Sequence, residues 1–463
     1  MRPPEAIAPR RIYDVAVLGP DVGGAATAAL LARRGLRVVL VPDGPVSKDA
    51  EGWILPGAIP PLPPLRQLNG AVGVLDELGL AQELQRQSAG PQGALQILGD
   101  GLRLSLPAEI VRRRSELRRE LGEEAERAEA ALQSLEQLTN HWNLLTSEPP
   151  PLPARGFFER RKLRKVLPGP QELPQGFVGD VLDSLAPFCA TLVGDTAPES
   201  SGREAAALLR SPLRLWGGAG QLWDLMRTRA EGVGGQVLSG RCSNLRLDKK
   251  AVLFEVDGAE VRSTAVVLAL SPERIAEMCE GGGKLEKKLA EEARLPASRK
   301  VALAHFVVRP EGIPQALEEA ALLFSNGEAL LLASLPARRV KGDLAGERLL
   351  TVARVVDFGF SDGAALLRDA RAALQPVLPF FEHHVVFEVS DLDPVHGQRL
   401  LQPHEGIHPE PIGLRALSET HERVLFASRE VYPGFGLEGA ILAARAATEH
   451  ALDLSGRKQV AAT

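Results

Sequence analysis

The first apolar stretch of the chain has the order of a strand, a helix and a second strand. Residues 12–18 are rich in β-forming side chains, residues 25–34 are rich in alanine and leucine, and residues 38–41 are entirely apolar. Glycines stand where the first strand would turn into the helix, and Gly35 follows the helical stretch. Because glycine commonly ends a helix, the pattern predicts a βαβ unit of about 30 residues.

A long polar segment, residues 105–147, carries one narrow apolar stripe. Its apolar residues recur at steps of three, four or seven: Leu117, Leu121, Ala125, Ala128, Leu132, Leu135, Trp142 and Leu145. A single stripe on a charged segment predicts a helical hairpin that packs along its own domain. A coiled coil through which two copies of the chain associate is the alternative, and the pattern leaves both open.

The next segment, residues 155–167, is strongly basic and interleaved with apolar residues. Its one acid is Glu159, against six cations: Arg155, Arg160, Arg161, Lys162, Arg164 and Lys165. Phe157 and Phe158 are among the apolar residues between them. This composition predicts an amphipathic helix that either packs by its apolar side or contacts an anionic membrane from the periphery.

The second half of the chain reads as short strands separated by helices. Strands are predicted at 236–238, 244–247, 252–256, 261–270, 302–308, 349–355 and 385–389. The first four would form a small antiparallel layer that returns to the main sheet, and the last three a second sheet. Helices are predicted after the glycines at 217–218, over 363–378 and over 439–454.

Length and composition restrict the function classes. With 463 residues, 44% apolar and 24% charged, the chain is expected to fold as two connected domains of ordinary globular composition. A net charge of −5 argues against a nucleic-acid partner. No apolar run approaches the roughly 20 residues that span a bilayer, and no secretory signal is recognised. Cys189, Cys242 and Cys279 are widely spaced, so we expect reduced thiols in a cytoplasmic protein, with peripheral membrane contact as the variant.

No metal site is predicted. His404 and His408 have the spacing of helical zinc ligands, but Pro403, Gly406 and Pro409 oppose a helix there. Neither a phosphate-binding Gly-Lys-Ser loop nor a nucleophile elbow is found, which removes the usual nucleotide hydrolases and α/β-hydrolases. Lys300, ahead of a predicted strand, is interpreted as a surface residue.

Three separated segments together point to a family. They are the glycine turn at 19–24, the Gly217-Gly218 turn followed by the strand at 264–270, and the C-terminal stretch 424–440 with Pro433-Gly434-Phe435-Gly436. In this order they resemble the phytoene desaturase and amine oxidase group of FAD-dependent oxidoreductases. The resemblance implies an α/β fold: a Rossmann-type (FAD/NAD(P)-binding) domain from residues 10–75, 214–285 and 412–463, with a mixed α+β substrate-type domain at 286–411 and a largely helical insert at 76–213.

The resemblance also implies a cofactor, FAD, and a hydrophobic small molecule as substrate. Residues at the matching positions are Gly19, Gly23 and Gly24 at the pyrophosphate turn, Asp43 near the adenosine ribose, and Arg429, Gly434, Gly436 and Gly439 near the flavin phosphate and ribityl chain. A dinucleotide turn needs glycines because the backbone must approach the pyrophosphate closely. The resemblance identifies no catalytic residue in this chain.

Several residues depart from the family pattern, and all of them fall on expected cofactor contacts. Asp21 replaces the middle glycine of the turn, and Pro42 stands where an acid should bind the ribose. Ser428 and Arg429 stand where the family usually carries Gly-Asp or Gly-Ala near the flavin. At about 4 Å, like charges repel by several kcal/mol at a surface-like effective dielectric constant, so Asp21 opposes a pyrophosphate. Arg429 would bind an anion or form a salt bridge with Asp21 or Asp43. A non-catalytic pseudo-oxidoreductase that binds or scaffolds is therefore the alternative function.

Overall fold

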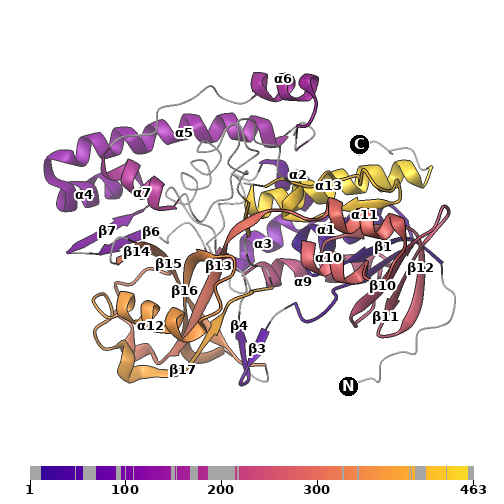
Figure 1. The fold of residues 1–463 in the computed structure, drawn as a ribbon. Helices are drawn as coiled ribbons and strands as arrows, with labels where there is room; N and C mark the ends of the chain where they lie inside the picture. The colour runs from indigo at the N-terminus through magenta and orange to yellow at the C-terminus, as the bar shows by residue number, and fades with distance from the viewer. Residues whose placement is uncertain are drawn as a thin grey trace.

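The fold is known from a computed structural model, shown in Figure 1. The residues that it describes are 12–46, 48–55, 69–89, 95–99, 101–107, 109–147, 152, 154–166, 176–185, 214–215, 218–325, 328–340, 344–395, 397, 399–401, 413–433 and 435–456. Two large mixed sheets, each with helices on it, make up this part of the chain (Figure 1).

The first sheet has seven strands in the described part of the chain, in the order β10-β11-β12-β1-β2-β9, with β19 paired to β12. Their bounds are β1 Ile12–Leu18, β2 Val38–Val41, β9 Gln236–Val237, β10 Cys242–Leu247, β11 Val252–Val256, β12 Ala259–Leu268 and β19 Val424–Phe426. β1 is parallel to both β2 and β12, and β12 is parallel to β19. The parallel pairing of β1 with β2 confirms the predicted βαβ unit, and β19, from the C-terminal segment, lies in the same sheet.

Helices cover both faces of this sheet. On one side α1 (Val22–Arg33) packs against α9 (Gly218–Gly232) and α13 (Gly436–Leu454), with α2 (Asn69–Glu77) and α3 (Ala81–Gln87) beside them. On the other side lie α10 (Pro272–Met278) and α11 (Lys284–Glu292), in contact with β10. α1 is buried from Val22 to Ala32, and its many alanines allow the close approach of two neighbouring helices.

The second sheet has eight described strands in the order β17-β13-β16-β15-β14-β6-β7, with β18 paired to β13. The bounds are β6 Leu95–Gly99, β7 Leu102–Leu106, β13 Ala297–Val308, β14 Ala320–Ser325, β15 Glu328–Arg338, β16 Leu344–Asp357, β17 Val385–Asp391 and β18 Arg399–Leu401. α12 (Gly363–Leu374) packs on one face through Leu366 and Leu374. Short ribbons pair β3 (Lys48–Ala50) with β4 (Trp53–Leu55), and β5 (Ser88–Ala89) with β8 (Arg214–Leu215).

The helical hairpin exists, but the prediction that it begins at residue 105 is wrong. Leu102, Leu104 and Leu106 alternate with polar residues and form β7, which turns back on β6 through Gly101 at a φ of 85°. The hairpin is α4 (Ile110–Leu121) and α5 (Ala125–Ser147), joined by one 3-10 turn, η2 (Gly122–Glu124). The helical prediction overlooked this period-two alternation, which favours a strand because it places the apolar side chains on one buried face.

The described half of the apolar stripe is used inside the chain. Leu117, Ala125, Ala128 and Leu132 are buried in one cluster with Leu104 of β7. The stripe continues after Leu132, but its later side chains lie outside the described set: Leu135, Trp142 and Leu145. Packing along its own domain therefore accounts for the described stripe, and self-association through 105–147 stays a prediction.

Two shorter helices follow: α6 (Phe157–Val166) and α7 (Phe177–Leu185). Within the described residues, no helix combines the length and the apolar character that crossing a bilayer demands. The division into domains at 10–75, 76–213, 214–285, 286–411 and 412–463 stays a prediction.

Truncating Leu117 tests the packing of the hairpin. We expect Leu117→Ala to lower the free energy of unfolding by about 2–5 kcal/mol, because a fully buried leucine leaves a cavity. Urea denaturation followed by circular dichroism measures the loss. The exposed neighbour Ser115 provides the control, and Ser115→Ala should change the free energy by less than about 0.5 kcal/mol. Equal effects of the two variants would show that the hairpin is not packed as described.

Candidate functional site

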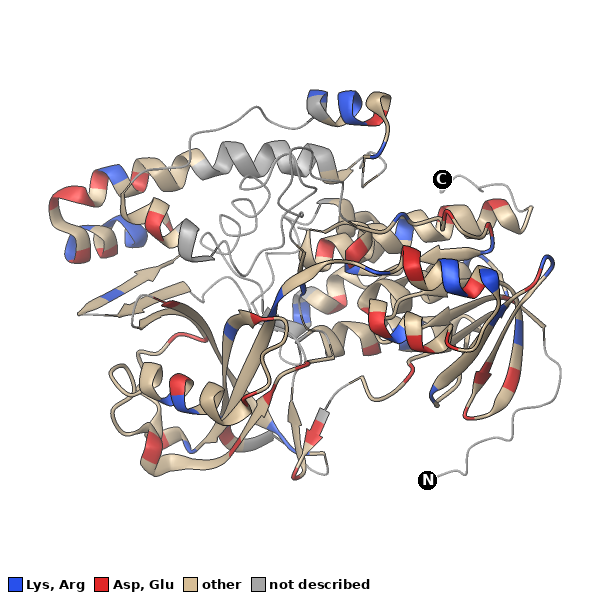
Figure 2. Ribbon diagram, in the orientation of Figure 1, with Lys and Arg blue, Asp and Glu red and all other residues tan. Residues whose placement is uncertain are grey.

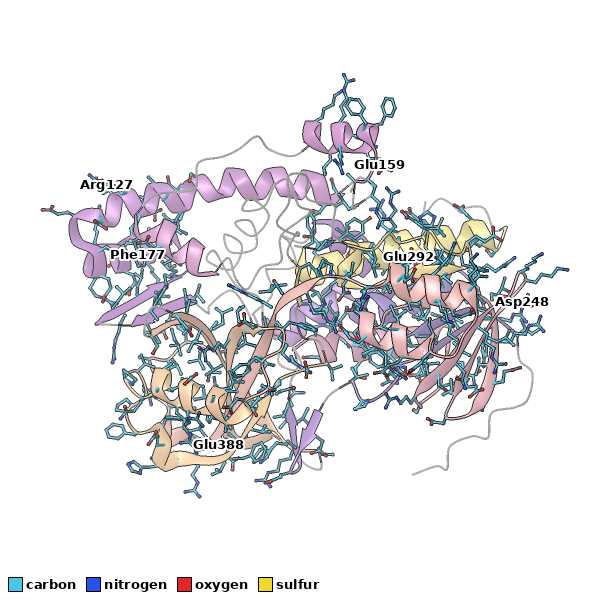
Figure 3. The ribbon with its side chains drawn as sticks, viewed as in Figure 1. Arg127, Glu159, Phe177, Asp248, Glu292 and Glu388 are labelled. Carbon is cyan, nitrogen blue, oxygen red and sulfur yellow. The ribbon has the colours of Figure 1, made fainter. Side chains whose placement is uncertain are left out.

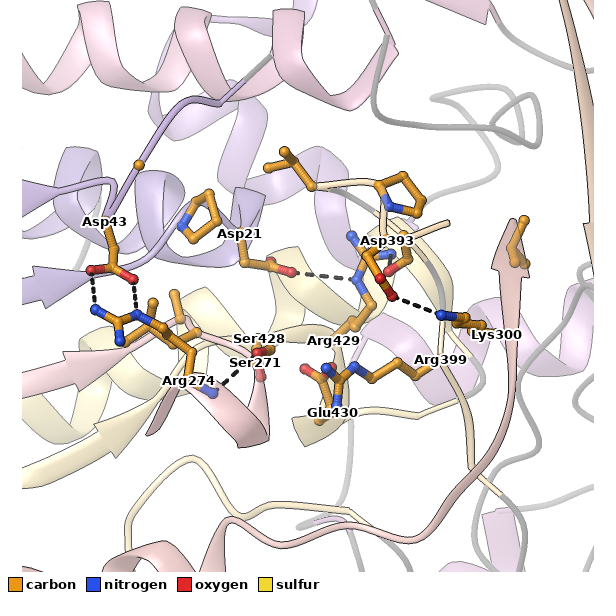
Figure 4. A pocket seen from close by; sticks show the side chains of 18 of the residues that line it. Asp21, Asp43, Ser271, Arg274, Lys300, Asp393, Arg399, Ser428, Arg429 and Glu430 are labelled. Atoms are coloured by element: carbon orange, nitrogen blue, oxygen red, sulfur yellow. Dashed lines mark hydrogen bonds and ion pairs between the residues drawn. The ribbon is translucent and has the colours of Figure 1, made fainter. Parts of the chain in front are cut away.

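A cavity of about 370 Å³ lies where the parallel strands of the first sheet end. One wall consists of the residues that follow β1, β2, β12 and β19, including Asp21, Asp43, Ser271 and Arg429. The other wall comes from the second sheet and its loops, including Lys300, Phe358, Asp393 and Arg399. Open α/β sheets bind ligands in the crevice at the carboxyl ends of their strands, so this is the candidate site (Figure 4).

Asp21 occupies the N-terminus of α1. It is the N-cap residue, and its Oδ1 accepts a hydrogen bond from the Gly23 N–H at 2.8 Å. The first N–H groups of a helix carry partial positive charge and bind phosphate or carboxylate. In this chain, the negative charge at the helix end belongs to the protein itself.

Arg429 faces Asp21 across the cavity, and the expected salt bridge between them is confirmed. The Arg429 Nε lies 3.3 Å from Asp21 Oδ2, and the two side chains are only 16% and 14% exposed (Figure 4). Arg429 Nη1 also donates to the Gly397 carbonyl at 3.2 Å, which ties this wall to a loop of the second sheet. Asp21, and not Asp43, is thus the acid that pairs with Arg429.

Asp43 is held by a different arginine. Arg274 of α10 donates from Nε to Asp43 Oδ2 at 2.6 Å and from Nη2 to Oδ1 at 3.1 Å. The Cys242 N–H also donates to Asp43 Oδ1, at 2.6 Å. With the Asp43 side chain 3% exposed and its backbone at a φ of 61°, the carboxylate turns away from the cavity centre and into β10 and α10.

Glu430 is a buried acid behind Arg429. Burial raises its pKa above the ordinary value of 4.5, and the neighbouring Asp21 carboxylate adds to the increase. The positive charges of Arg429 and Arg399 act in the opposite direction and partly offset this increase in the pKa of Glu430. The buried Ser428 Oγ lines the cavity without a partner that satisfies hydrogen-bond geometry among the described residues.

The sequence analysis missed one cation of the site, Arg399, and was wrong about another, Lys300. Lys300 is not a surface residue: its Nζ lies 2.9 Å from Asp393 Oδ1, and its side chain is largely buried against the cavity. Arg399 pairs with Glu273 and lies 5.4 Å from the centre of the Phe358 ring. The sequence carried no signal for either role, because the placement of Lys300 and Arg399 on this wall depends on how β13 and β18 cross the end of the first sheet.

The glycines of the first turn are required by the packing of the chain itself. A Cβ on Gly19 would lie 2.0 Å from the Ala269 carbonyl oxygen, and one on Gly23 would lie 2.3 Å from that of Ala427. Gly24 is equally closed by the Ala269 side chain, and Gly439 by the Tyr432 carbonyl. Gly436 has a φ of 50° at the start of α13, and Gly434 lies outside the described residues. Gly19, Gly23, Gly24 and Gly439 would therefore be needed whether or not a phosphate lay against the turn.

The residues present do not fit a flavin dinucleotide in the family's usual mode. The α1 N-terminus, which would hold the pyrophosphate, already has the Asp21 carboxylate, and that carboxylate is fixed by Gly23 and Arg429. The acid nearest the expected ribose position, Asp43, is fully engaged by Arg274 and Cys242. A pyrophosphate would have to displace a paired carboxylate of its own sign.

Comparison with known proteins gives a fold and no family. No family model and no curated protein matches the sequence. Wild-type putrescine oxidase bound to putrescine has a TM-score of 0.55 at 14% identity, covering 97% of this chain and 100% of its own. Cyclohexylamine oxidase from Brevibacterium oxydans has 0.54 at 15%, covering 96% and 100%. A putative protoporphyrinogen oxidase from Exiguobacterium has 0.50 at 13%, covering 96% and 99%.

The chain therefore has the fold of these oxidases. At such low identity the likeness extends to the fold alone, and it agrees with the mixed α/β architecture that the sequence predicted.

Removing the Asp43 carboxylate tests its structural role. We expect Asp43→Asn to lower the free energy of unfolding by about 3 kcal/mol, because the partly buried Arg274 then lacks its main counter-charge. Glu277, the exposed second partner of Arg274, supplies the matched control: Glu277→Gln should cost less than about 1 kcal/mol. Urea denaturation of both variants decides, and equal losses would contradict the assignment.

Glu430 should make stability depend on pH. Its pKa is raised in the folded protein, so it stabilises the fold fully below the unfolded-state pKa, and this contribution is lost as pH rises through the folded-state pKa. Glu430→Gln removes this dependence. The unfolding free energy of the variant relative to wild type should therefore increase with pH above about 4.5. A difference that does not vary with pH would mean that Glu430 is not buried as described.

Proposed function

We propose that this protein is a non-catalytic relative of the flavin oxidases, a binding or scaffold protein that keeps their fold without binding FAD in the usual mode. The observation that carries the proposal is the Asp21 carboxylate at the N-terminus of α1, paired with Arg429. An internal carboxylate satisfies the helix end that a cofactor phosphate would otherwise satisfy.

The charges of Asp21 and Arg429 support the proposal. An arriving pyrophosphate would meet Asp21 and would gain from Arg429 only by breaking a partly buried salt bridge. Such a bridge loses little to solvent screening, so the exchange is unfavourable. Reduction of a flavin has no part in this function, and a small molecule would be bound without being oxidised. The predicted ligand class is a hydrophobic small molecule.

An active flavin-dependent oxidoreductase acting on a hydrophobic small molecule is the second candidate. The observation in its favour is that the solved oxidases match over 96% or more of this chain. In this case the pyrophosphate would need a contact other than the first helix turn, and FAD would be retained. The two candidates differ in one measurable property, which is the affinity for FAD.

Flavin titration separates them. We expect wild-type protein to be purified colourless and to quench FAD fluorescence weakly or not at all. A triple variant, Asp21→Gly with Arg429→Asp and Pro42→Glu, should bind FAD at least about tenfold more tightly. It removes the repulsive carboxylate and restores an acid for the ribose, a gain of about 1.4 kcal/mol or more.

Arg118→Asp is the control for this titration. It changes the net charge by the same amount as the triple variant but lies on the exposed side of α4, so its FAD affinity should equal that of wild type. Wild-type protein that copurifies with stoichiometric flavin would overturn the proposal and favour the oxidoreductase.

A further inference from the structure

α6 is attached to the rest of the fold by one side. Leu163 is buried, and Glu159 Oε2 accepts hydrogen bonds from Arg415 Nη2 at 2.6 Å and from the Arg155 N–H at 3.0 Å. Burial alone would raise the pKa of Glu159, but these hydrogen bonds outweigh it and hold the pKa below its ordinary value. Figure 3 shows Glu159 between α6 and the body of the protein, near the end where the chain enters the helix.

The opposite side of α6 carries two phenylalanines and three cations. At 100° per residue, Phe157, Phe158, Arg161, Lys162 and Lys165 fall within one face, and Leu163 lies opposite its centre. The Phe rings occupy the first turn and the three cations the following two turns. We call these five residues the outer face of α6.

The outer face is open to solvent. Phe157 is 74% exposed and Phe158 is 81% exposed, and their rings meet edge to face with centroids 5.7 Å apart. Arg161, Lys162 and Lys165 are exposed too, and in the part of the chain that the structure describes none of them forms an ion pair. Figure 2 shows the basic residues on this helix, which is drawn above the C-terminal part of α5 at the top of the molecule (Figure 1).

We propose that the outer face of α6 docks the protein onto an anionic membrane surface, with Phe157 and Phe158 inserted at headgroup depth and the three cations against lipid phosphates and carboxylates. This inference is independent of the proposed function.

The charge and the rings both match a lipid interface. Phenylalanine is one of the apolar residues that interfacial helices bury at the boundary between headgroups and acyl chains, and lysine and arginine keep their charged ends in the headgroup layer. The outer face contains no acid, although the whole chain has a net charge of −5. An anionic surface would therefore attract this helix and orient the molecule with α6 toward it. Short basic helices with apolar residues bind reversibly, and their binding weakens in salt.

Vesicle cosedimentation of the full-length protein tests the proposal. We expect wild type to bind vesicles of phosphatidylcholine mixed with phosphatidylserine, and to bind pure phosphatidylcholine vesicles far more weakly. Phe157→Ser with Phe158→Ser should reduce binding at least about tenfold, since two ring side chains no longer leave water. Neutralising Arg161, Lys162 and Lys165 as glutamines should reduce it on the order of a hundredfold, at roughly fivefold for each cation.

Matched substitutions elsewhere supply the controls. Phe380→Ser removes another highly exposed ring, which is 66% exposed and lies between α12 and β17. Arg112→Gln with Arg118→Gln removes two exposed cations from α4. These variants should bind the anionic vesicles as wild type does, and circular dichroism should show all variants folded. The proposal is overturned if wild type stays in the supernatant, if it binds neutral and anionic vesicles equally, or if the control substitutions weaken binding as much as those on α6.

Discussion

The site is organised around the Asp21 carboxylate at the N-terminus of α1. A buried helix must satisfy its first N–H groups, and in a dinucleotide-binding fold a phosphate from the cofactor can do so. In this chain, Asp21 accepts the Gly23 N–H and Arg429 neutralises the carboxylate. The helix end, the end of β19 and the loop that contains Gly397 are thereby held together without a ligand.

Asp43 also binds groups of the protein itself where a cofactor contact is expected. Its carboxylate stands near the expected ribose position, yet it joins β2 to α10 through Arg274 and to β10 through the Cys242 N–H. Arg399 and Lys300, on the opposite wall, also have acids of the chain as partners. Charges that could recognise an anionic cofactor are thus paired within the protein, and the Arg399–Glu273 pair joins the second sheet to α10.

The glycines of the first turn are explained by packing of the chain, without reference to a cofactor. Their retention suggested a nucleotide-binding turn, but the backbone carbonyls of Ala269 and Ala427 lie so close to Gly19 and Gly23 that any side chain would collide. A fold can therefore preserve these residues after its ligand contacts have changed. The likeness to solved oxidases and the glycine turn therefore indicate how the chain packs. The residue that bears on phosphate binding is Asp21, through its charge.

The sequence alone determined the elements whose cause is local. Alanine-rich 25–34, apolar 38–41 and the glycine turn between strand and helix predicted the βαβ unit, because periodicity and turn chemistry act over a few residues. With the family resemblance, opposite charges at two turns predicted an anion or a salt bridge for Arg429, with Asp21 and Asp43 as the possible acids, and the structure decides for Asp21. Locally ambiguous stretches failed: Ser105 was assigned to a helix, although the alternation of Leu102, Leu104 and Leu106 places it in β7.

Only the tertiary structure could decide which distant residues share the cavity. Lys300 and Arg399 reach it because β13 and β18 pass the carboxyl ends of the first sheet, and Asp43 finds Arg274 across 231 positions of the chain. The exposure of Phe157 and Phe158 was likewise undecided, since an amphipathic pattern does not say which face the protein covers. Charge pairing and burial at these positions depend on contacts between segments far apart in the chain, and no local pattern encodes those contacts.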